Sequence, residues 1–168
     1  MKIPSMFDLT EKVALISGAS RGIGSAIAQT LAEFGAEVIL TSRRIENLKE
    51  VETQIKESGK KASFIACHNG ELGEIEALFE KIRQTHGSLD ILVNNAATNP
   101  YYGPVIDAEE KSWDKTLSVN LKGPFFMSQH AARLMRENGG GAIVNVSSIN
   151  GKIPIRYQSI YSITKAGI

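Results

Sequence analysis

Three residues near the C-terminal end of the chain are spaced for acid–base chemistry. Tyr161 and Lys165 are four residues apart, so on a helix they share one face and the ammonium can act on the phenol. A free phenol loses its proton near pH ~10, and an adjacent positive charge favours the phenolate. Ser148 lies 13 residues before the tyrosine and could hydrogen-bond the same substrate oxygen. The set predicts a site that reduces carbonyls or oxidises alcohols.

A glycine-rich segment near the N-terminal end is suited to binding an anion. Residues 17–24 read Ser-Gly-Ala-Ser-Arg-Gly-Ile-Gly and lie between a predicted strand at 12–17 and a predicted helix at 23–34. Glycines here allow a tight turn and the close approach of a pyrophosphate to the free N–H groups of a helix. We therefore expect a dinucleotide at this loop. The predicted contacts are Gly18, Ser20, Arg21, Gly22, Ile23 and Gly24.

Two rival motifs share letters with this loop. Gly18 to Gly22 fit the G-x-S-x-G elbow of hydrolases. That elbow needs an oxyanion-hole donor from an earlier strand–helix loop, and residues 1–11 cannot supply one. A P-loop needs a lysine after its last glycine, where this chain has Ser25. Hydrolase and kinase or NTPase chemistry are therefore disfavoured.

The end of the second predicted strand bears on cofactor choice. An acidic residue there would hold the ribose 2′-hydroxyl of NAD, but residues 41–44 read Thr-Ser-Arg-Arg. Two guanidinium groups suit a 2′-phosphate, and Arg21 could add a third positive charge. The sequence thus favours NADP(H) over NAD(H), with Ser42, Arg43 and Arg44 as contacts. The alternative is that both arginines simply begin a solvated helix.

The elements around these motifs alternate between apolar strands and helices. Strands are predicted at 12–17, 37–42, 62–66, 89–93 and 142–146. Helices are predicted at 23–34, 45–57, 71–86, 109–118, 121–137 and from 159. This pattern predicts a doubly wound parallel sheet in a three-layer α/β/α, Rossmann-like fold. Because such sheets normally run 3-2-1-4-5-6, we expect one NAD(P)-binding domain over 1–168 that lacks its C-terminal strands.

The bulk composition is that of an ordinary globular protein. The 168 residues are 42% hydrophobic and 22% charged, with a net charge of +1. Nothing here favours nucleic acid or a membrane as partner, and we expect neither a secretory signal nor a bilayer-spanning segment. The lone Cys67 excludes an internal disulfide and suits the cytoplasm. No His, Cys, Asp or Glu set has metal-ligand spacing.

Together these segments resemble the short-chain dehydrogenase/reductase family over essentially the whole chain. The glycine loop matches the family's T-G-x-x-x-G-x-G, with serine in place of threonine. Residues 94–97, Asn-Asn-Ala-Ala, match its N-N-A-G. Asn120 falls on its catalytic asparagine, Ser148 on its serine, and Tyr161 and Lys165 on its Y-x-x-x-K.

The resemblance implies a role for each matched residue. Tyr161 would protonate the carbonyl oxygen as hydride arrives, and would act as the base in reverse. Lys165 would favour the phenolate and hold the nicotinamide ribose. Ser148 would orient the substrate oxygen, and Asn120 would help hold a water that links the lysine to solvent. The cofactor contacts implied outside the glycine loop and second strand are Asn94, Ala96, Tyr161 and Lys165.

The departures from the family pattern bear on the branch. His68 stands where family members often carry an aspartate near the adenine, and Ala97 replaces a glycine. Residues 95–100 together with Cys67 and His68 look like the NADPH-dependent carbonyl and retinol reductase branch. A 3-oxoacyl-carrier-protein reductase or a sugar dehydrogenase fits almost as well.

The resemblance also implies a chain shortened at its C-terminus. Family members usually continue with a sixth strand, a substrate-covering loop and a seventh strand, and form homodimers or homotetramers. We expect a small-molecule carbonyl or alcohol as substrate. Two alternatives stay open: a non-catalytic nucleotide-binding fragment whose substrate half is lost, and an assembly role through the helices at 109–137.

Overall fold

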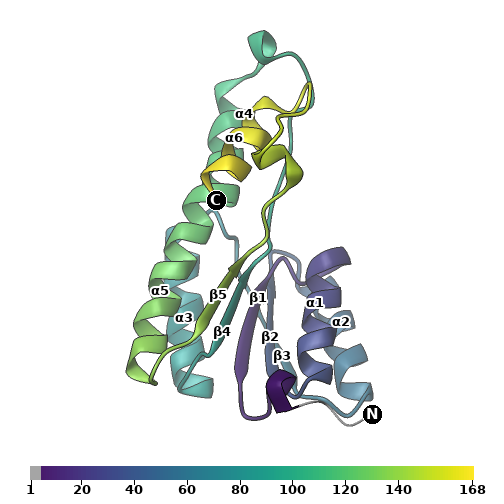
Figure 1. The fold of residues 1–168 in the computed structure, drawn as a ribbon, viewed down its shortest axis with the longest axis vertical. Helices are drawn as coiled ribbons and strands as arrows, with labels where there is room; N and C mark the ends of the chain where they lie inside the picture. The colour runs from purple at the N-terminus through teal and green to yellow at the C-terminus, as the bar shows by residue number, and fades with distance from the viewer. Residues whose placement is uncertain (1–4) are drawn as a thin grey trace.

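The computed structural model describes residues 5–168, which contain a five-stranded parallel sheet between two layers of helices (Figure 1). The strands are β1 (Val13–Ser17), β2 (Glu37–Ser42), β3 (Ala62–Ala66), β4 (Ile91–Asn94) and β5 (Ala142–Asn145). They are ordered β3-β2-β1-β4-β5, and every neighbouring pair is parallel. This confirms the doubly wound α/β/α fold predicted from the sequence.

Six α-helices accompany the sheet in the described part of the chain. They are α1 (Gly22–Glu33), α2 (Ile45–Glu57), α3 (Leu72–His86), α4 (Glu110–Leu117), α5 (Gly123–Glu137) and α6 (Ser159–Gly167). Figure 1 shows α1 and α2 on one side of the sheet and α3 and α5 on the other. Each side has its own apolar cluster, to which β1 contributes alternately: Leu15 to the α3–α5 side and Ile16 to the α1–α2 side. Burial on both faces explains why the central strands β1 and β2 are almost continuously apolar.

Most element boundaries lie within one residue of the predictions, and two differ by more. The fourth strand begins at Ile91 rather than at residue 89, because Asp90 precedes the ladder and its carboxylate accepts the N–H of Val13 at 2.9 Å. The helices predicted at 109–118 and 121–137 are joined by a π-helical turn (Ser118–Lys122) instead of being separated. Pro124 has no N–H to donate to the preceding turn, which interrupts the α-helical pattern there.

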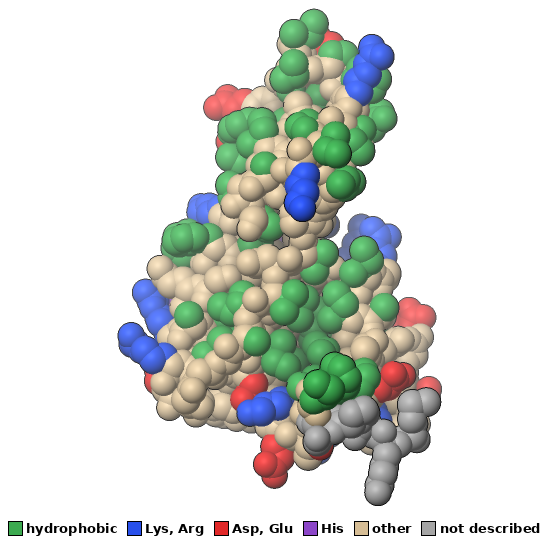
Figure 2. Space-filling model, in the orientation of Figure 1, with side chains coloured by type: hydrophobic (Ala, Val, Ile, Leu, Met, Phe, Trp, Pro, Cys, Tyr) green, Lys and Arg blue, Asp and Glu red, His purple; other side chains and the backbone are tan. Residues whose placement is uncertain are grey.

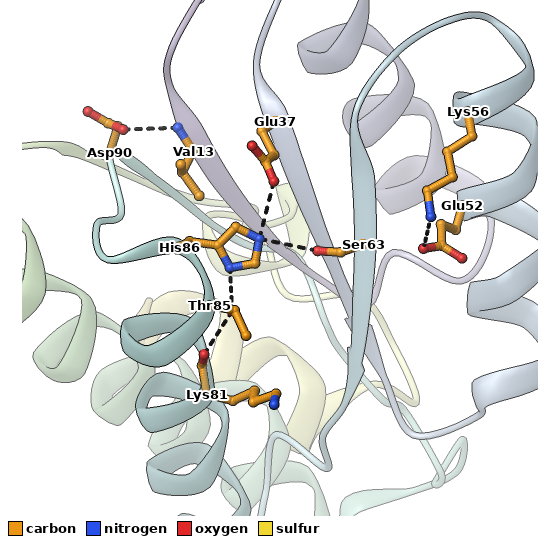
Figure 3. A network of polar contacts seen from close by, with 9 residues as sticks. All are labelled: Val13, Glu37, Glu52, Lys56, Ser63, Lys81, Thr85, His86 and Asp90. Carbon is orange, nitrogen blue, oxygen red and sulfur yellow. Dashed lines mark hydrogen bonds and ion pairs between the residues drawn. The ribbon is translucent and has the colours of Figure 1, made fainter.

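Polar contacts link neighbouring elements at the edge of the sheet where the strands begin (Figure 3). His86, at the end of α3, contacts the carboxylate of Glu37 in β2 at 3.3 Å and the hydroxyl of Ser63 in β3 at 3.5 Å. The Asp90–Val13 contact fastens β4 to β1 at the same edge. The strand register is therefore fixed far from the loops that carry the predicted site.

Residues 95–122 and 146–168 rise above the opposite edge of the sheet and are called here the upper lobe (Figure 1). It contains α4 and α6, and its two segments are joined by the N–H of Gly103, which donates to the carbonyl oxygen of Tyr157 at 3.0 Å. Within residues 5–168, no helix combines the length and apolarity needed to cross a membrane. Nor do three or more His, Cys, Asp or Glu side chains in this range come together to hold a metal ion.

Candidate active site

The glycine loop joins β1 to α1 and is pinned to the segment that follows β4. Asn95 Nδ2 donates to the carbonyl oxygens of Ser17 (2.9 Å) and Gly18 (3.2 Å). The Ser17 hydroxyl accepts the N–H groups of Asn95 (3.0 Å) and Ala96 (3.1 Å). Gly18 has a φ of +67°, and a Cβ at this position would lie 2.8 Å from the Cα of Ala96. Only glycine fits this approach of two backbones.

The first turn of α1 is equally intolerant of a side chain at one position. A Cβ on Gly24 would overlap the carbonyl oxygen of Gly18 and lie 2.5 Å from Asn95 Nδ2. Arg21, the N-cap residue, makes no side-chain hydrogen bond to the helix. The free N–H groups of the helix are thus left without a side-chain cap from the described residues, as an anion site at a helix N-terminus requires.

A cavity of about 440 Å³ opens where β1, β2, β3 and β4 end. Seven predicted cofactor contacts line it: Gly18, Ser20, Arg21, Ser42, Arg43, Arg44 and Ala96. Its lining includes four cationic side chains, those of Arg21, Arg43, Arg44 and Lys115, and no acidic residue of the described chain. A cavity with this charge at this edge of a parallel sheet fits an anionic dinucleotide.

Four predicted contacts of the glycine loop and β4 lie outside the cavity lining: Gly22, Ile23, Gly24 and Asn94. Asn94 is buried in β4, where its Nδ2 donates to Asn145 Oδ1 (2.9 Å) and Ser128 Oγ (3.0 Å). It therefore joins β4 to β5 and α5.

Several cavity residues were not assigned to the site from the sequence: Asn47, Cys67, His68, Asn69, Asn95, Ala97, Thr98, Lys115 and Val119. The residues at 67–69 and 95–98 directly follow β3 and β4. Because the carboxyl ends of parallel strands meet at one edge of the sheet, their positions in the sequence could have predicted that they line the cavity. Lys115 and Val119 come from the α4 region and had no comparable signal.

Asn120 occupies the π-helical turn and is fully buried. Its Oδ1 accepts the N–H of Thr98 (2.7 Å), while its Nδ2 donates to the carbonyl oxygen of Thr98 (2.8 Å) and to Thr164 Oγ1 (3.2 Å). Asn120 thus ties the cavity wall to α6. The water predicted for this residue would have to use the remaining lone pair of Oδ1 or the backbone carbonyl.

Tyr161 and Lys165 lie side by side on α6, as their spacing predicts. Lys165 Nζ is 5.8 Å from the centroid of the Tyr161 ring and donates to the carbonyl oxygen of Val146 at 2.6 Å. The lysine is only 4% exposed, and its burial lowers the pKa of the ammonium from the ordinary value. The structure therefore holds a cationic side chain in the interior beside the phenol.

The two adjacent serines after β5 have different contacts. Ser147 Oγ donates to the carbonyl oxygen of Lys165 at 2.8 Å, so its proton is already used. Ser148 Oγ accepts the N–H of Asn150 at 3.2 Å and caps the short turn Ile149–Gly151. Because accepting leaves the Ser148 proton uncommitted, the geometry favours Ser148 as the serine able to donate to a substrate oxygen.

Comparison with known proteins identifies the family. Residues 12–168 match the sequence model described as short chain dehydrogenase. The human protein "Dehydrogenase/reductase SDR family member 4" is 38% identical over 160 residues, which cover 95% of this chain and 58% of that relative. This chain therefore spans somewhat more than half the length of that protein.

Solved structures agree with the sequence match. A metagenomic short-chain oxidoreductase in complex with NADP superposes with a TM-score of 0.91 at 38% identity, covering 95% of this chain and 72% of that one. An NAD⁺-bound xylitol dehydrogenase gives a TM-score of 0.91 at 28% identity, covering 95% and 61%. Sequence and fold lead to the same assignment: the chain belongs to the short-chain dehydrogenases, a family of oxidoreductases.

Proposed function

We propose that this protein is an NADP(H)-dependent oxidoreductase that interconverts an alcohol and a ketone or aldehyde. One observation carries the proposal: hydrogen bonds connect the cationic cavity to the helix of the acid–base pair. Thr98 lines the cavity, Asn120 bonds to Thr98, and Thr164 of α6 bonds to Asn120. Cofactor and acid–base group are thereby held in one framework, as hydride transfer with proton transfer requires.

The cationic cavity supports NADP(H) as the cofactor. Arg43 and Arg44 line it directly after β2, and Arg21 lines it from the glycine loop. Among the described residues, the lining holds no carboxylate that could bind a ribose hydroxyl. Guanidinium groups bind phosphate oxygens in bidentate fashion. The solved relatives include one with NADP and one with NAD⁺, so the shared fold does not by itself determine which cofactor binds. In this proposal, the arginines determine the preference of this chain for NADP(H).

Each catalytic residue would act at a stated atom. When bound, the nicotinamide cofactor supplies or accepts the hydride. The Tyr161 hydroxyl gives its proton to the substrate oxygen in reduction and takes it back in oxidation. Lys165, 5.8 Å from the ring centroid, stabilises the phenolate electrostatically, and the Ser148 hydroxyl donates to the same substrate oxygen.

Tyr161→Phe tests this assignment. The loss of a general acid lowers the rate by roughly 10²–10⁴-fold, while affinity for NADPH stays within about twofold. The readout is NADPH oxidation against a panel of aldehydes and ketones, with cofactor affinity from fluorescence titration. Tyr157→Phe is the matched control, because it removes the same hydroxyl four residues earlier and should leave turnover unchanged. Full turnover in the Tyr161 variant would refute the mechanism.

The nucleotide-binding alternative has a distinct outcome in the same experiment. If the 168-residue chain binds NADPH but oxidises it with no carbonyl in the panel, binding without catalysis is favoured.

Self-association is the second part of the proposal. Phe125 on α5 is 64% exposed and Trp113 on α4 is 40% exposed, apolar surface that a second copy would cover. Sedimentation velocity should show a homodimer or homotetramer, and Phe125→Ser should shift it toward monomer. A strictly monomeric wild-type chain would contradict an assembly role for these helices.

A further inference from the structure

The helix that carries Tyr161 begins at a residue that does not cap it. Gln158 is the N-cap residue of α6, yet its side chain makes no hydrogen bond to the first turn, and glutamine is not among the residues that favour this position. Its backbone is fixed on both sides, because its N–H donates to the carbonyl oxygen of Ile155 at 3.2 Å and its carbonyl oxygen accepts the N–H of Ser162 at 2.9 Å. The side chain is therefore available for contacts outside the helix.

Two asparagines orient the carboxamide of Gln158. Its Oε1 accepts Asn150 Nδ2 at 3.0 Å and Asn99 Nδ2 at 3.3 Å. Since these two donors occupy the oxygen, the amide is fixed and the N–H groups of Nε2 point elsewhere. No atom within residues 5–168 accepts a hydrogen bond from Nε2, and this nitrogen is not one of the enclosed polar atoms of the half-buried residues. Gln158 thus presents two donors that are open to a ligand.

These donors lie close to the phenol of the proposed general acid. The N-cap residue and the third residue of a helix are neighbours, as in a capping box, and Tyr161 is the third residue of α6. The proposed serine is connected to the same place through Asn150, which is 4% exposed. Asn150 donates its N–H to Ser148 Oγ at 3.2 Å and its Nδ2 to Gln158. The hydroxyls of Tyr161 and Ser148 and the amide of Gln158 are therefore held in one neighbourhood.

The three groups differ in what they offer a substrate. The hydroxyls of Tyr161 and Ser148 would both contact the reacting oxygen, whereas Gln158 Nε2 is a separate donor. Such a donor suits a substrate with a second acceptor oxygen close to the reacting one. We propose that Gln158 binds the substrate and selects α-oxygenated ketones, in which the carbon next to the carbonyl bears an ether, hydroxyl or carbonyl oxygen. This inference rests on the proposed function, because it concerns the substrate of that same site.

A matched pair of ketones tests the proposal. Methoxyacetone and 2-pentanone have the same number of heavy atoms, and the ether oxygen of the first takes the place of a methylene group in the second. The readout is kcat/KM for each ketone with NADPH and the 168-residue chain. Because an ether oxygen activates the neighbouring carbonyl in any enzyme, the informative quantity is the ratio of the two values, compared between the wild type and its variants.

Gln158→Glu distinguishes a substrate donor from a structural support. The carboxylate keeps an oxygen for Asn99 and Asn150 but has no N–H to donate, and its charge affects both ketones alike. The ratio should fall roughly fivefold to tenfold, as expected for one hydrogen bond, and Gln158→Leu should lower it similarly. Gln84→Leu is the matched control, because Gln84 lies on α3, outside the upper lobe, and the ratio should not change. Thermal unfolding checks that each variant is folded, and if one Gln158 variant does not fold, the other decides the test.

A second readout does not depend on turnover. With NADP⁺ in place of NADPH the ketones cannot be reduced, and NMR of the isotope-labelled chain then follows the side-chain amide of Gln158. Its signals are identified as those that disappear in Gln158→Glu. Methoxyacetone should shift these signals more than 2-pentanone does at the same concentration.

The outcomes separate this inference from the proposed function. A ratio that stays the same in the Gln158 variants overturns the role of Gln158 and leaves the oxidoreductase assignment intact. Preferential shifts by methoxyacetone in a chain that reduces no carbonyl support the role of Gln158 in binding and contradict the catalytic assignment. A chain that shows neither turnover nor shifts overturns both.

Discussion

The cofactor cavity and the upper lobe position their functional residues in different ways. The glycine loop at the cavity packs so closely that a Cβ on Gly18 or Gly24 would collide with neighbouring atoms, and hydrogen bonds of Asn95 and Ser17 hold it in place. In the upper lobe, Asn120 and Lys165 are held by side-chain hydrogen bonds, while many apolar side chains stay exposed, including Ile106 (89%) and Ile153 (65%) (Figure 2). Substitutions at these two glycines should therefore act by steric collision, and substitutions of Asn120 or Lys165 by the loss of hydrogen bonds.

Gly24→Val should have the largest effect. The new side chain would collide with the carbonyl oxygen of Gly18 and with Asn95, so the glycine loop cannot keep its shape. Overpacking of this kind costs about 1–3 kcal/mol or more, and we expect NADPH binding to be lost. Fluorescence titration and thermal unfolding measure the two effects. Gly73→Ala, where a Cβ meets nothing within 4 Å, should change neither; normal binding by Gly24→Val would show that the loop is not sterically determined.

Asn120→Leu should be the largest effect in the upper lobe. It leaves the N–H and the carbonyl of Thr98 without their side-chain partner, at a cost of about 2–4 kcal/mol, while the hydroxyl of Thr164 loses one donor but still donates to the carbonyl oxygen of Tyr161. Because the glycine loop is untouched, NADPH affinity should fall by only a few-fold while turnover falls much further. Urea unfolding measures the loss of stability, fluorescence titration the NADPH affinity, and steady-state kinetics the turnover. Equal losses in affinity and turnover would contradict a division between the two regions.

Cys67, which lines the cavity, should make the stability of the folded protein depend on pH. Burial, with a smaller contribution from the charge of Glu74, raises the pKa of this thiol to about 12. The unfolded thiol ionises near pH ~8.5, so between that value and pH 12 the unfolded state loses the proton first and stability falls as pH rises. Urea unfolding at pH 8 and pH 10 should show this loss in the wild type and less of it in Cys67→Ala. An identical pH response in both chains would argue against a buried thiol.

Lys165 should give a smaller effect of opposite sign in the upper lobe. Burial lowers the pKa of its ammonium, so the folded state releases this proton at a lower pH than the unfolded state does. Stability should therefore rise with pH from the lowered value up to the ordinary lysine value of 10.5. Between pH 7 and pH 9.5, the unfolding free energy of the wild type should therefore rise relative to that of Lys165→Met. A flat difference would mean that the lysine is not desolvated.

The fold was largely predictable because its signals are local. Strand hydrophobicity, the glycine turn and helix periodicity place most elements within one or two residues. The π-helical turn at Ser118–Lys122 was not predictable in the same way, since the sequence there reads as one helix ending and another beginning, and only Pro124 indicates an irregularity. The start of β4 likewise depends on its pairing with β1, which is a tertiary contact.

Residues of the candidate site that directly follow a strand could be predicted from the sequence. Residues whose place in the site depends on their tertiary surroundings could not. Arg43 and Arg44 directly follow β2, and both line the cavity. Asn69 also follows a strand, but only its surroundings in the structure reveal that its Nδ2 has no hydrogen-bond partner within residues 5–168. Lys115 reaches the cavity from α4, far along the chain from the nearest strand end, so no local pattern could assign it.

A side-by-side titration of the 168-residue chain with NADPH and NADH tests the central claim most directly. It is repeated in a variant that combines Arg43→Ser and Arg44→Ser. We expect NADPH to bind at least about tenfold more tightly than NADH, because the arginines bind the 2′-phosphate, and we expect the variant to lose this preference. Equal or tighter binding of NADH by the wild type, or a preference for NADPH that survives in the variant, would contradict the claim that this cavity selects NADP(H) through its arginines.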